Sequence, residues 1–153
     1  MIEWMKVGVV LAVGALLAAC ASPGYLDRRA ELAAAAQTGD PIAQFELGKS
    51  YCCGYGGGYS TVRALDWFCK SALQGYGPAQ YELGRIYGDR SDTAYRQSLR
   101  QDRIYSYMWY SLAALQEIPF ADAERDALAK DMTQRELAEA RQHVRDWKDR
   151  GCR

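Results

Sequence analysis

The sequence lacks most of the features by which catalytic and nucleic-acid-binding proteins are recognised. It has one histidine, and its 19 Lys and Arg residues are balanced by 19 Asp and Glu residues. This balance provides no basic face of the kind that nucleic-acid-binding proteins carry, so we expect no nucleic-acid partner. No two cysteines have the Cys-x-x-Cys spacing of zinc and thiol-redox sites. β-Branched residues are scarce after the N-terminus, which favours helices over sheets.

A convincing catalytic group is also missing. The single histidine, His143, lies beside Arg141 and Arg145 and off the apolar stripe of its segment, so we expect it on the solvated surface. Without a second base, a Ser or Cys nucleophile has no partner that could activate it. The glycine-rich stretch 54–58 lacks the Gly-Lys-Ser/Thr that follows in a phosphate-binding loop. We therefore predict no enzymatic activity, no cofactor and no metal site.

A nine-residue stretch occurs twice and organises the chain. Residues 43–51 read AQFELGKSY and residues 79–87 read AQYELGRIY, an offset of 36 residues. A period of this length indicates a repeat architecture, and the Ala, Leu and Tyr spaced by four indicate one face of a helix. Gly48 and Gly84 lie inside these helices, where glycine costs about 1 kcal/mol relative to Ala. We expect another helix to cross close to the backbone at both glycines.

Turn and capping residues divide the repeats into helix pairs. The first unit is expected to have helices over 41–52 and 61–73. The second is expected to have helices over 78–87 and 102–116, and the loop between them carries a six-residue insertion. Gly39 and Gly75 follow helix ends, where a left-handed residue is common.

Further helices are expected at both ends of the repeats. Residues 26–37 form a helix candidate that precedes the first unit, and residues 121–132 form a divergent helix that follows the second. Thr133 and Glu136 then have the spacing of a capping box. We expect them to begin a last helix whose buried stripe is Leu137, Ala140, Val144 and Trp147.

The N-terminus has the pattern of a bacterial lipoprotein signal over residues 1–19. The apolar run 7–17 is too short to span a bilayer, and Leu17-Ala18-Ala19-Cys20 resembles the lipobox. The resemblance implies that Cys20 becomes the lipidated mature N-terminus, with residues 20–26 as a tether. Ser22 follows at the second mature position, which by resemblance to Gram-negative lipoproteins favours the outer membrane. We expect a palmitoylated protein anchored in the bacterial envelope and facing the periplasm.

The repeated positions resemble the Sel-like repeat, an α/α relative of the tetratricopeptide repeat. The motif positions that carry the resemblance are Leu47, Gly48, Tyr51, Trp67, Ala72, Leu83, Gly84, Tyr87, Trp109 and Ala114. The resemblance implies a short right-handed α/α solenoid over 27–150, with units at about 40–75 and 76–117. A degenerate third unit over 119–148 includes the C-terminal capping helix. It also implies a non-catalytic scaffold for protein–protein interaction, whose partner would be an envelope protein or peptide.

The connections within the helix pairs are candidates for the partner-binding surface. Successive units place these loops at one end of the array, and Tyr and Arg are typical interface anchors. The candidate residues are Tyr55, Tyr59, Tyr95, Arg96, Arg100 and Arg103. Two other interpretations stay open. Long loops tolerate polar residues without any function, and exposed aromatic residues could instead bind glycan or peptidoglycan.

Four cysteines remain once Cys20 is assigned to lipid. In an exported chain, the even number of Cys52, Cys53, Cys69 and Cys152 suggests disulfides. Cys52 and Cys53 close one helix and Cys69 lies early in the antiparallel next one. We therefore expect a bridge from one of the vicinal pair to Cys69, and Cys152 could take the other. Adjacent cysteines are poor tetrahedral ligands, so a metal site is the less favoured alternative.

Overall fold

The computed structural model describes residues 23–52, 60–88 and 99–152. All regular structure in these ranges is helical. No helix of this part of the chain is long and apolar enough to cross a membrane. The signal segment and Cys20 lie outside the described residues, as do Cys53 and most of the two long loops.

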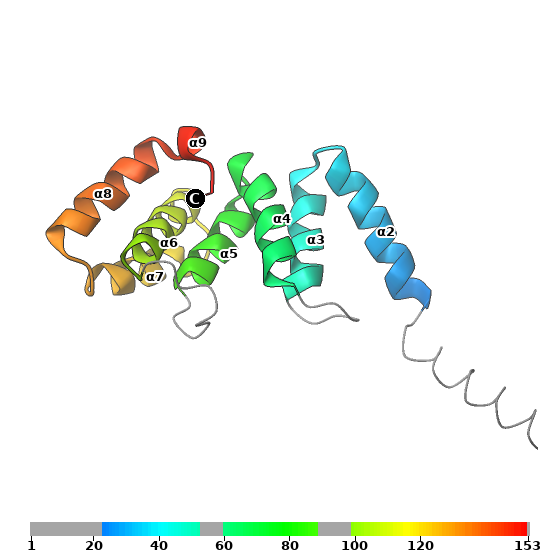
Figure 1. Ribbon diagram of the computed structural model, residues 1–153, viewed down its shortest axis with the longest axis horizontal. Helices are drawn as coiled ribbons and strands as arrows, with labels where there is room; N and C mark the ends of the chain where they lie inside the picture. The colour runs from blue at the N-terminus through cyan, green and yellow to red at the C-terminus, as the bar shows by residue number, and fades with distance from the viewer. Residues whose placement is uncertain (1–22, 53–59, 89–98, 153) are drawn as a thin grey trace, which may run out of the picture.

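The helices follow one another along an elongated array (Figure 1). They are α2 (Pro23–Gln37), α3 (Pro41–Cys52), α4 (Thr61–Leu73), α5 (Gly77–Gly88), α6 (Leu99–Ala114), α7 (Ala121–Ala129), α8 (Gln134–Arg145) and α9 (Trp147–Arg150). The bounds expected for α3 and α4 are confirmed. The expected tether is too long, because α2 begins at Pro23. Proline is well tolerated in a first helical turn, where its missing N–H needs no partner.

Local capping explains where the repeat helices begin and end. The Asp40 carboxylate accepts a hydrogen bond from the backbone N–H of Ile42 at the start of α3. The Ser60 hydroxyl accepts one from the backbone N–H of Arg63 at the start of α4. Gly39 and Gly75 adopt φ values of 100° and 89° at the turns after α2 and α4. Only glycine enters this region without strain, so these residues set the reversal between helices.

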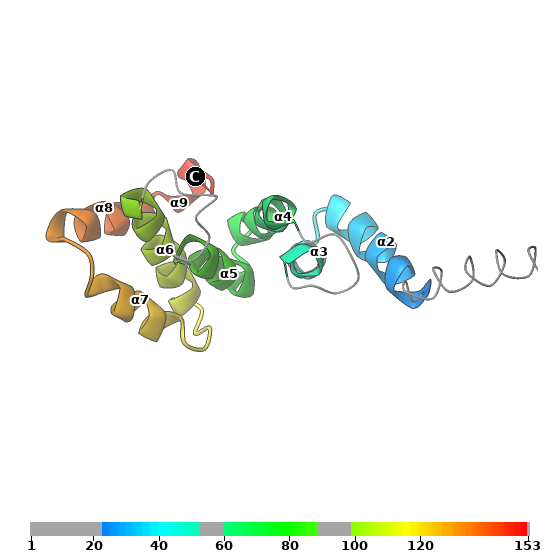
Figure 2. The ribbon, with the colours of Figure 1, turned by 60° about the horizontal axis from the view of Figure 1, so that its bottom comes forward.

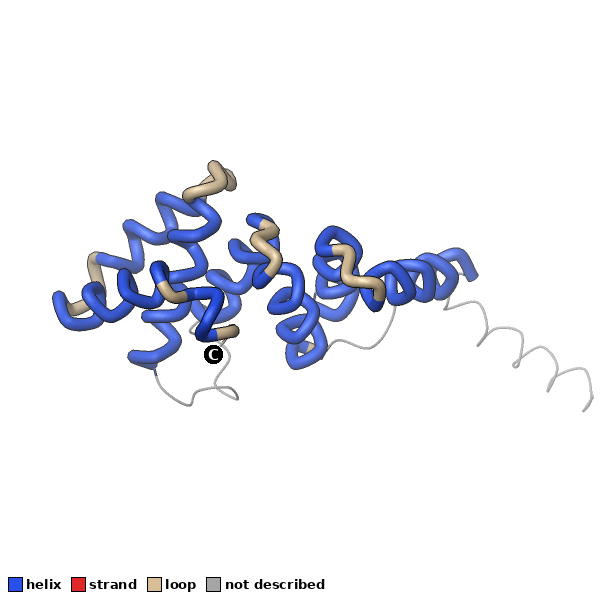
Figure 3. The backbone as a smooth tube through the Cα atoms, turned by 90° about the horizontal axis from the view of Figure 1, so that it is seen from above, coloured by secondary structure: helices blue, strands red, loops and turns tan. Residues whose placement is uncertain are grey.

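Each helix packs against the next one along the chain, from α2 to α7. Figure 3 shows this succession from above, with short connections between the described helices. The main core lies between α4, α5 and α6 and includes Phe68, Leu83, Met108 and Trp109, all fully buried. A smaller core joins α2 to α3 through Ala36, Ala43 and Leu47. Stacked helix pairs thus bury apolar faces that one pair alone would leave exposed.

The two glycines inside the repeat helices allow a close approach of an aromatic ring, which confirms the expectation for both. A Cβ atom on Gly48 would lie 2.7 Å from the ring of Phe68, and one on Gly84 would lie 2.6 Å from the ring of Tyr110. Phe68 and Tyr110 occupy equivalent positions on α4 and α6. Both units therefore make the same contact. A glycine in the first helix of the pair, which we call helix A, leaves room for a ring from the second helix, which we call helix B.

A buried glutamine joins three helices in each unit. The side-chain amide of Gln80 donates to the carbonyl oxygen of Ala72 at 3.2 Å, and its oxygen accepts from the amide of Gln116 at 2.7 Å. In the first unit, the amide of Gln44 donates to the carbonyl of Ala36 at 3.1 Å, and its oxygen accepts from the amide of Gln74 at 2.8 Å. The glutamines thus link each unit to the helix before it.

The repeated glutamates each pair with a cation on their own helix. Glu46 pairs with Lys49 at 3.1 Å, and Glu82 pairs with Arg85 at 2.9 Å. Both pairs have i, i+3 spacing on an exposed helix face, where one pair contributes only a few tenths of a kcal/mol. These glutamates are therefore part of the solvated surface.

The C-terminal part departs from the repeat pattern. Helices α7 and α8 both pack on α6 and lie to either side of it (Figure 2). The expected last helix is interrupted, because α8 ends at Arg145 and Asp146 leaves the helical conformation. Helix α9 then turns the chain back, so that the C-terminus lies beside α5 rather than at the end of the array (Figure 1).

Candidate functional site

The expected binding loops can be placed only in part. Tyr55, Tyr59, Tyr95 and Arg96 lie outside the described residues. Arg100 lies in the first turn of α6, and nothing is described of its side chain. The structure therefore describes only the ends of these loops, and a shared binding site of the candidate residues stays a prediction.

Arg103 makes a structural contact that we did not expect from the sequence. Its guanidinium Nη2 lies 2.7 Å from Oε1 of Glu136, so the side chain joins α6 to α8. The Glu136 side chain is buried, and the Arg103 side chain is 29% exposed. The pair fixes the C-terminal helix on the second unit. Arg103 thus has a role in the fold, and its part in partner binding stays a prediction.

The same glutamate completes the expected capping box, which is confirmed. The Thr133 hydroxyl accepts from the backbone N–H of Glu136, and the Glu136 carboxylate accepts from the backbone N–H of Thr133. The backbone hydrogen bond from Thr133, then the bonds from Arg103 and the Thr133 hydroxyl, lower the pKa of Glu136 to about 2. The carboxylate is therefore ionised at neutral pH and holds α8 at its N-terminus.

Burial also changes the titration of the ring that packs on Gly84. It raises the pKa of the Tyr110 phenol above its usual range, and nearby Glu124 acts in the same direction. Burial likewise raises the pKa of the Asp102 carboxyl group. Neither shift comes with a neighbouring group arranged for proton transfer in the described part of the chain, so both are consequences of packing.

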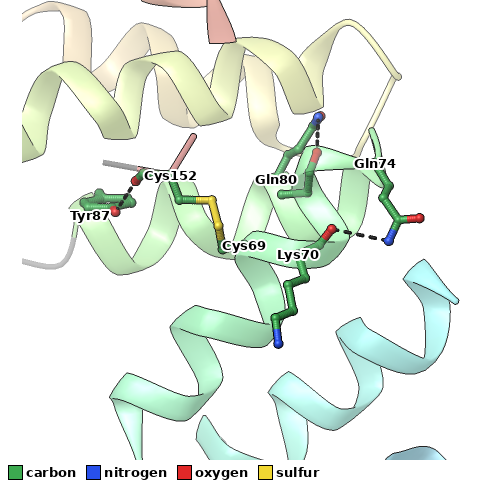
Figure 4. Close-up of a disulfide and its surroundings, with 7 residues drawn as sticks. Cys69, Lys70, Gln74, Gln80, Tyr87 and Cys152 are labelled. Carbon is green, nitrogen blue, oxygen red and sulfur yellow. Dashed lines mark hydrogen bonds between the residues drawn. A yellow bond between two sulfur atoms is a disulfide. The ribbon is translucent and has the colours of Figure 1, made fainter. Parts of the chain in front are cut away.

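The disulfide pairing differs from the expectation. Cys69 on α4 bonds to Cys152, which follows α9, across a sequence separation of 83 residues (Figure 4). The predicted bridge from Cys52 or Cys53 to Cys69 is therefore wrong. Cys52 is disulfide-bonded, but to neither of these two cysteines. The sequence could not reveal the pairing, because it gave no sign that the C-terminus folds back to α4.

The second repeat tyrosine anchors the returning chain. The Tyr87 hydroxyl donates a hydrogen bond to the carbonyl oxygen of Cys152 (Figure 4). The ring of Tyr87 lies 5.5 Å from that of Tyr105, measured between centroids. Tyr87, a motif position of the repeat, therefore also holds the C-terminal segment, a role that the repeat pattern does not predict.

His143 is buried, contrary to our expectation of a solvated residue. Its side chain is 3% exposed, and its ring lies 5.3 Å from the ring of Tyr105. Further along, Trp147 packs edge-on against Trp109, with ring centroids 6.3 Å apart. The expectation failed because the buried face of α8 is wider than the predicted stripe. His143 follows Ala140 by three residues and so lies on the same side of the helix, where Leu137 and Ala140 also pack on α6.

The C-terminal segment thereby covers one face of the second unit, which we call the second-unit face. It consists of Tyr87, Tyr105, Trp109 and Leu112. The equivalent positions of the first unit are Tyr51, Arg63, Trp67 and Lys70, which we call the first-unit face. The two tryptophans have equivalent surroundings on their inner sides. Trp67 packs against the α2–α3 core, and Trp109 lies in the main core between α4, α5 and α6.

Cations cover the rings of the first-unit face. The guanidinium carbons of Arg29 and Arg63 lie 4.0 and 5.6 Å from the ring centroid of Tyr51. The Lys70 ammonium lies 4.0 Å from the ring centroid of Trp67. These distances are typical of cation–π contacts. The face combines aromatic surface with positive charge, which is chemistry suited to binding rather than to catalysis.

The described residues do not gather three or more His, Cys, Asp or Glu side chains in an arrangement that could hold a metal ion. The buried titratable groups have structural partners: Glu136 bonds to Arg103, and His143 packs on Tyr105. These groups therefore serve the packing of α6 and α8.

Comparison with known proteins agrees with this architecture. The sequence profile of the Sel1 repeat matches residues 41–76 and 77–117, the two helix pairs α3–α4 and α5–α6. The crystal structure of a protective antigen present in uropathogenic Escherichia coli strains, which displays an SLR fold, is similar with a TM-score of 0.67. That likeness has 24% sequence identity and covers 79% of this chain but only 25% of the antigen, so it shows the fold alone. No protein with a curated description matches. The two matched units together span half of the chain, and the protein belongs to the Sel1 repeat family.

Proposed function

We propose that this protein is a lipid-anchored envelope scaffold that holds another envelope protein or peptide. The observation that carries the proposal is the pair of stacked Sel1 units, since repeats of this family typically build scaffolds for protein–protein interaction. Their described surface carries exposed aromatic and charged side chains and no reaction centre.

The sequence before α2 supports the anchored form. The lipobox-like residues 17–20 precede α2 by only a few positions, so a lipid on Cys20 would hold the array close to the membrane. Lipid attachment gives membrane affinity of about 0.8 kcal/mol per buried CH₂ group. The Cys20→Ser variant should then lose incorporation of labelled palmitate and move from the membrane to the soluble fraction. Unchanged membrane fractionation and labelling would contradict the anchor.

The scaffold function is tested by cross-linking in cells, followed by purification of the full-length protein from envelope extract. A chain that lacks residues 91–98 of the long second loop is the matched comparison, since α6 begins only at Leu99. One dominant protein that is recovered with the intact chain and lost with the shortened chain would support a scaffold that uses this loop. Recovery of muropeptides or sugars, with no specific protein, would contradict the scaffold function.

A further inference from the structure

The two repeat units place equivalent faces in different environments. Tyr87 corresponds to Tyr51, and Trp109 corresponds to Trp67. The second-unit face is occupied, because Trp147 packs edge-on against Trp109 and the Cys152 carbonyl accepts from Tyr87. The second unit thus shows what this face of a unit can bind. Its occupant is an aromatic side chain, Trp147, on a short segment that also contacts Tyr87 at the end of helix A.

The substitutions between the two faces follow this difference. In the second unit, Tyr105 and Leu112 are 8% and 6% exposed beneath the C-terminal segment. Their equivalents in the first unit are Arg63 and Lys70, which are both exposed. The aromatic positions Tyr51 and Trp67 are kept and are only partly buried. Between these two cations, the exposed Asp66 takes the place of the fully buried Met108. The first-unit face therefore keeps the two aromatic side chains and replaces the flanking apolar contacts with two cations and one carboxylate, which leaves it positively charged.

We propose that the first-unit face binds an acidic protein segment that carries an aromatic side chain. The aromatic side chain would pack against Trp67 as Trp147 packs against Trp109. Its flanking carboxylates would pair with Arg63 and Lys70, and Arg29 adds a third cation at the Tyr51 ring. Because the partner is a protein, this inference rests on the proposed scaffold function and specifies the chemistry of the segment that is held.

The charge of the site excludes the chain's own C-terminal segment as the occupant. Residues 140–150 read ARQHVRDWKDR and carry four basic and two acidic residues, so the segment of a second copy would meet like charge. Like charges at close range oppose docking, whereas complementary charge favours both encounter and the correct register. A segment with the same aromatic residue and reversed flanking charge fits the site.

The test uses two fluorescein-labelled synthetic peptides and the oxidised full-length protein. One peptide copies residues 140–150, and the other carries R141E, R145E, K148E and R150E around the same tryptophan. The Cys69–Cys152 bond keeps the second-unit face filled during the measurement. In fluorescence anisotropy, the acidic peptide should bind and the basic one should not. Binding should weaken as salt is raised, because surface charge is screened within about 8 Å at physiological ionic strength.

A charge-reversed protein makes the assignment specific. The double variant Arg63→Glu and Lys70→Glu changes two exposed side chains and should weaken the acidic peptide at least tenfold. The same variant should gain affinity for the basic peptide. Arg141→Glu, an exposed change on α8, is the matched control and should leave both results unchanged. Circular dichroism verifies that all variants keep their helices.

Two results would overturn the inference: equal binding of the two peptides to the wild-type protein, or acidic-peptide binding that survives the double charge reversal. The scaffold function is judged separately. A partner that is recovered from envelope extract by both the wild type and the double variant would retain the scaffold and reject this face. Recovery of no protein by either would reject the scaffold itself.

Discussion

The side-chain amide of Gln116 lies 2.7 Å from the side-chain oxygen of Gln80, and this bond couples the end of helix B to helix A of the same unit. Gln80 is 1% exposed and passes the connection on to the carbonyl of Ala72 in the preceding unit. Gln74 and Gln44 make the same contact one unit earlier. A polar network that is fully paired inside a core fixes the register in which neighbouring helices stack.

Gln80→Leu should destabilise the protein by about 1–3 kcal/mol, because the change removes both side-chain hydrogen bonds of a buried residue, one to the Ala72 carbonyl and one from the Gln116 amide. Urea denaturation followed by circular dichroism measures this loss. Gln37→Leu, at an exposed position of α2, is the control and should change stability by less than about 0.5 kcal/mol. Equal stability of the two variants would show that the network contributes little.

Gly84→Ala should destabilise the second unit by about 1–3 kcal/mol, although alanine is the better helix former. The new Cβ atom would lie 2.6 Å from the ring of Tyr110, which is buried, so the ring or the backbone would have to shift. In a protein that already carries Tyr110→Leu, Gly84→Ala should cost less stability than it does in the wild type, because the ring that the new Cβ atom would meet is gone. Strict additivity of the two changes in a thermal-unfolding cycle would argue against this contact.

Cys69→Ser and Cys152→Ser should each lower the free energy of unfolding by about 2–4.5 kcal/mol, since the bond closes a loop of 83 residues. The double variant should be no less stable than either single variant. Mass spectrometry of a non-reduced digest should recover the peptide of Cys69 joined to that of Cys152. A peptide that joins Cys69 to Cys52 would contradict the pairing.

The contribution of Glu136 to stability should depend on acid pH. Its pKa is about 2 in the folded protein against an ordinary value of 4.5. Because the folded-state pKa is depressed, the stabilisation is complete above about pH 4.5 and is lost as the pH falls toward 2.

Glu136→Gln should therefore be less stable than the wild type at pH 7, and the difference should shrink between pH 4.5 and 2.5. Denaturation series at several pH values measure it. Glu82→Gln, at the Glu82–Arg85 surface pair, should show a much smaller difference throughout. A Glu136→Gln difference that is constant with pH would rule out the ionised carboxylate as its cause.

The helices and their repeat contacts were predictable because they depend on local and periodic signals. The spacing of Leu47 and Leu83, the interior glycines and the Thr133–Glu136 box each determine structure within a few residues. The course of the C-terminal segment was not predictable in this way. It depends on contacts of Trp147 and Cys152 with residues 38 and 83 positions earlier, and no repeat periodicity encodes them. The burial of His143 was missed for a different reason, because it depends on how α8 packs against Tyr105 of α6 and not on the apolar pattern of α8 itself.

The bond between Cys69 and Cys152 also determines how tension would travel through the molecule. A pull between the N-terminal side and the C-terminus would pass along α2, α3 and the first part of α4 and then cross directly at the two sulfur atoms. The stretch between the cysteines, residues 70–151, includes α5 to α9 and would bear none of that load. The second unit would keep its shape under mechanical stress that could open the first. In the lipid-anchored form that we propose, the first unit is then the part that yields.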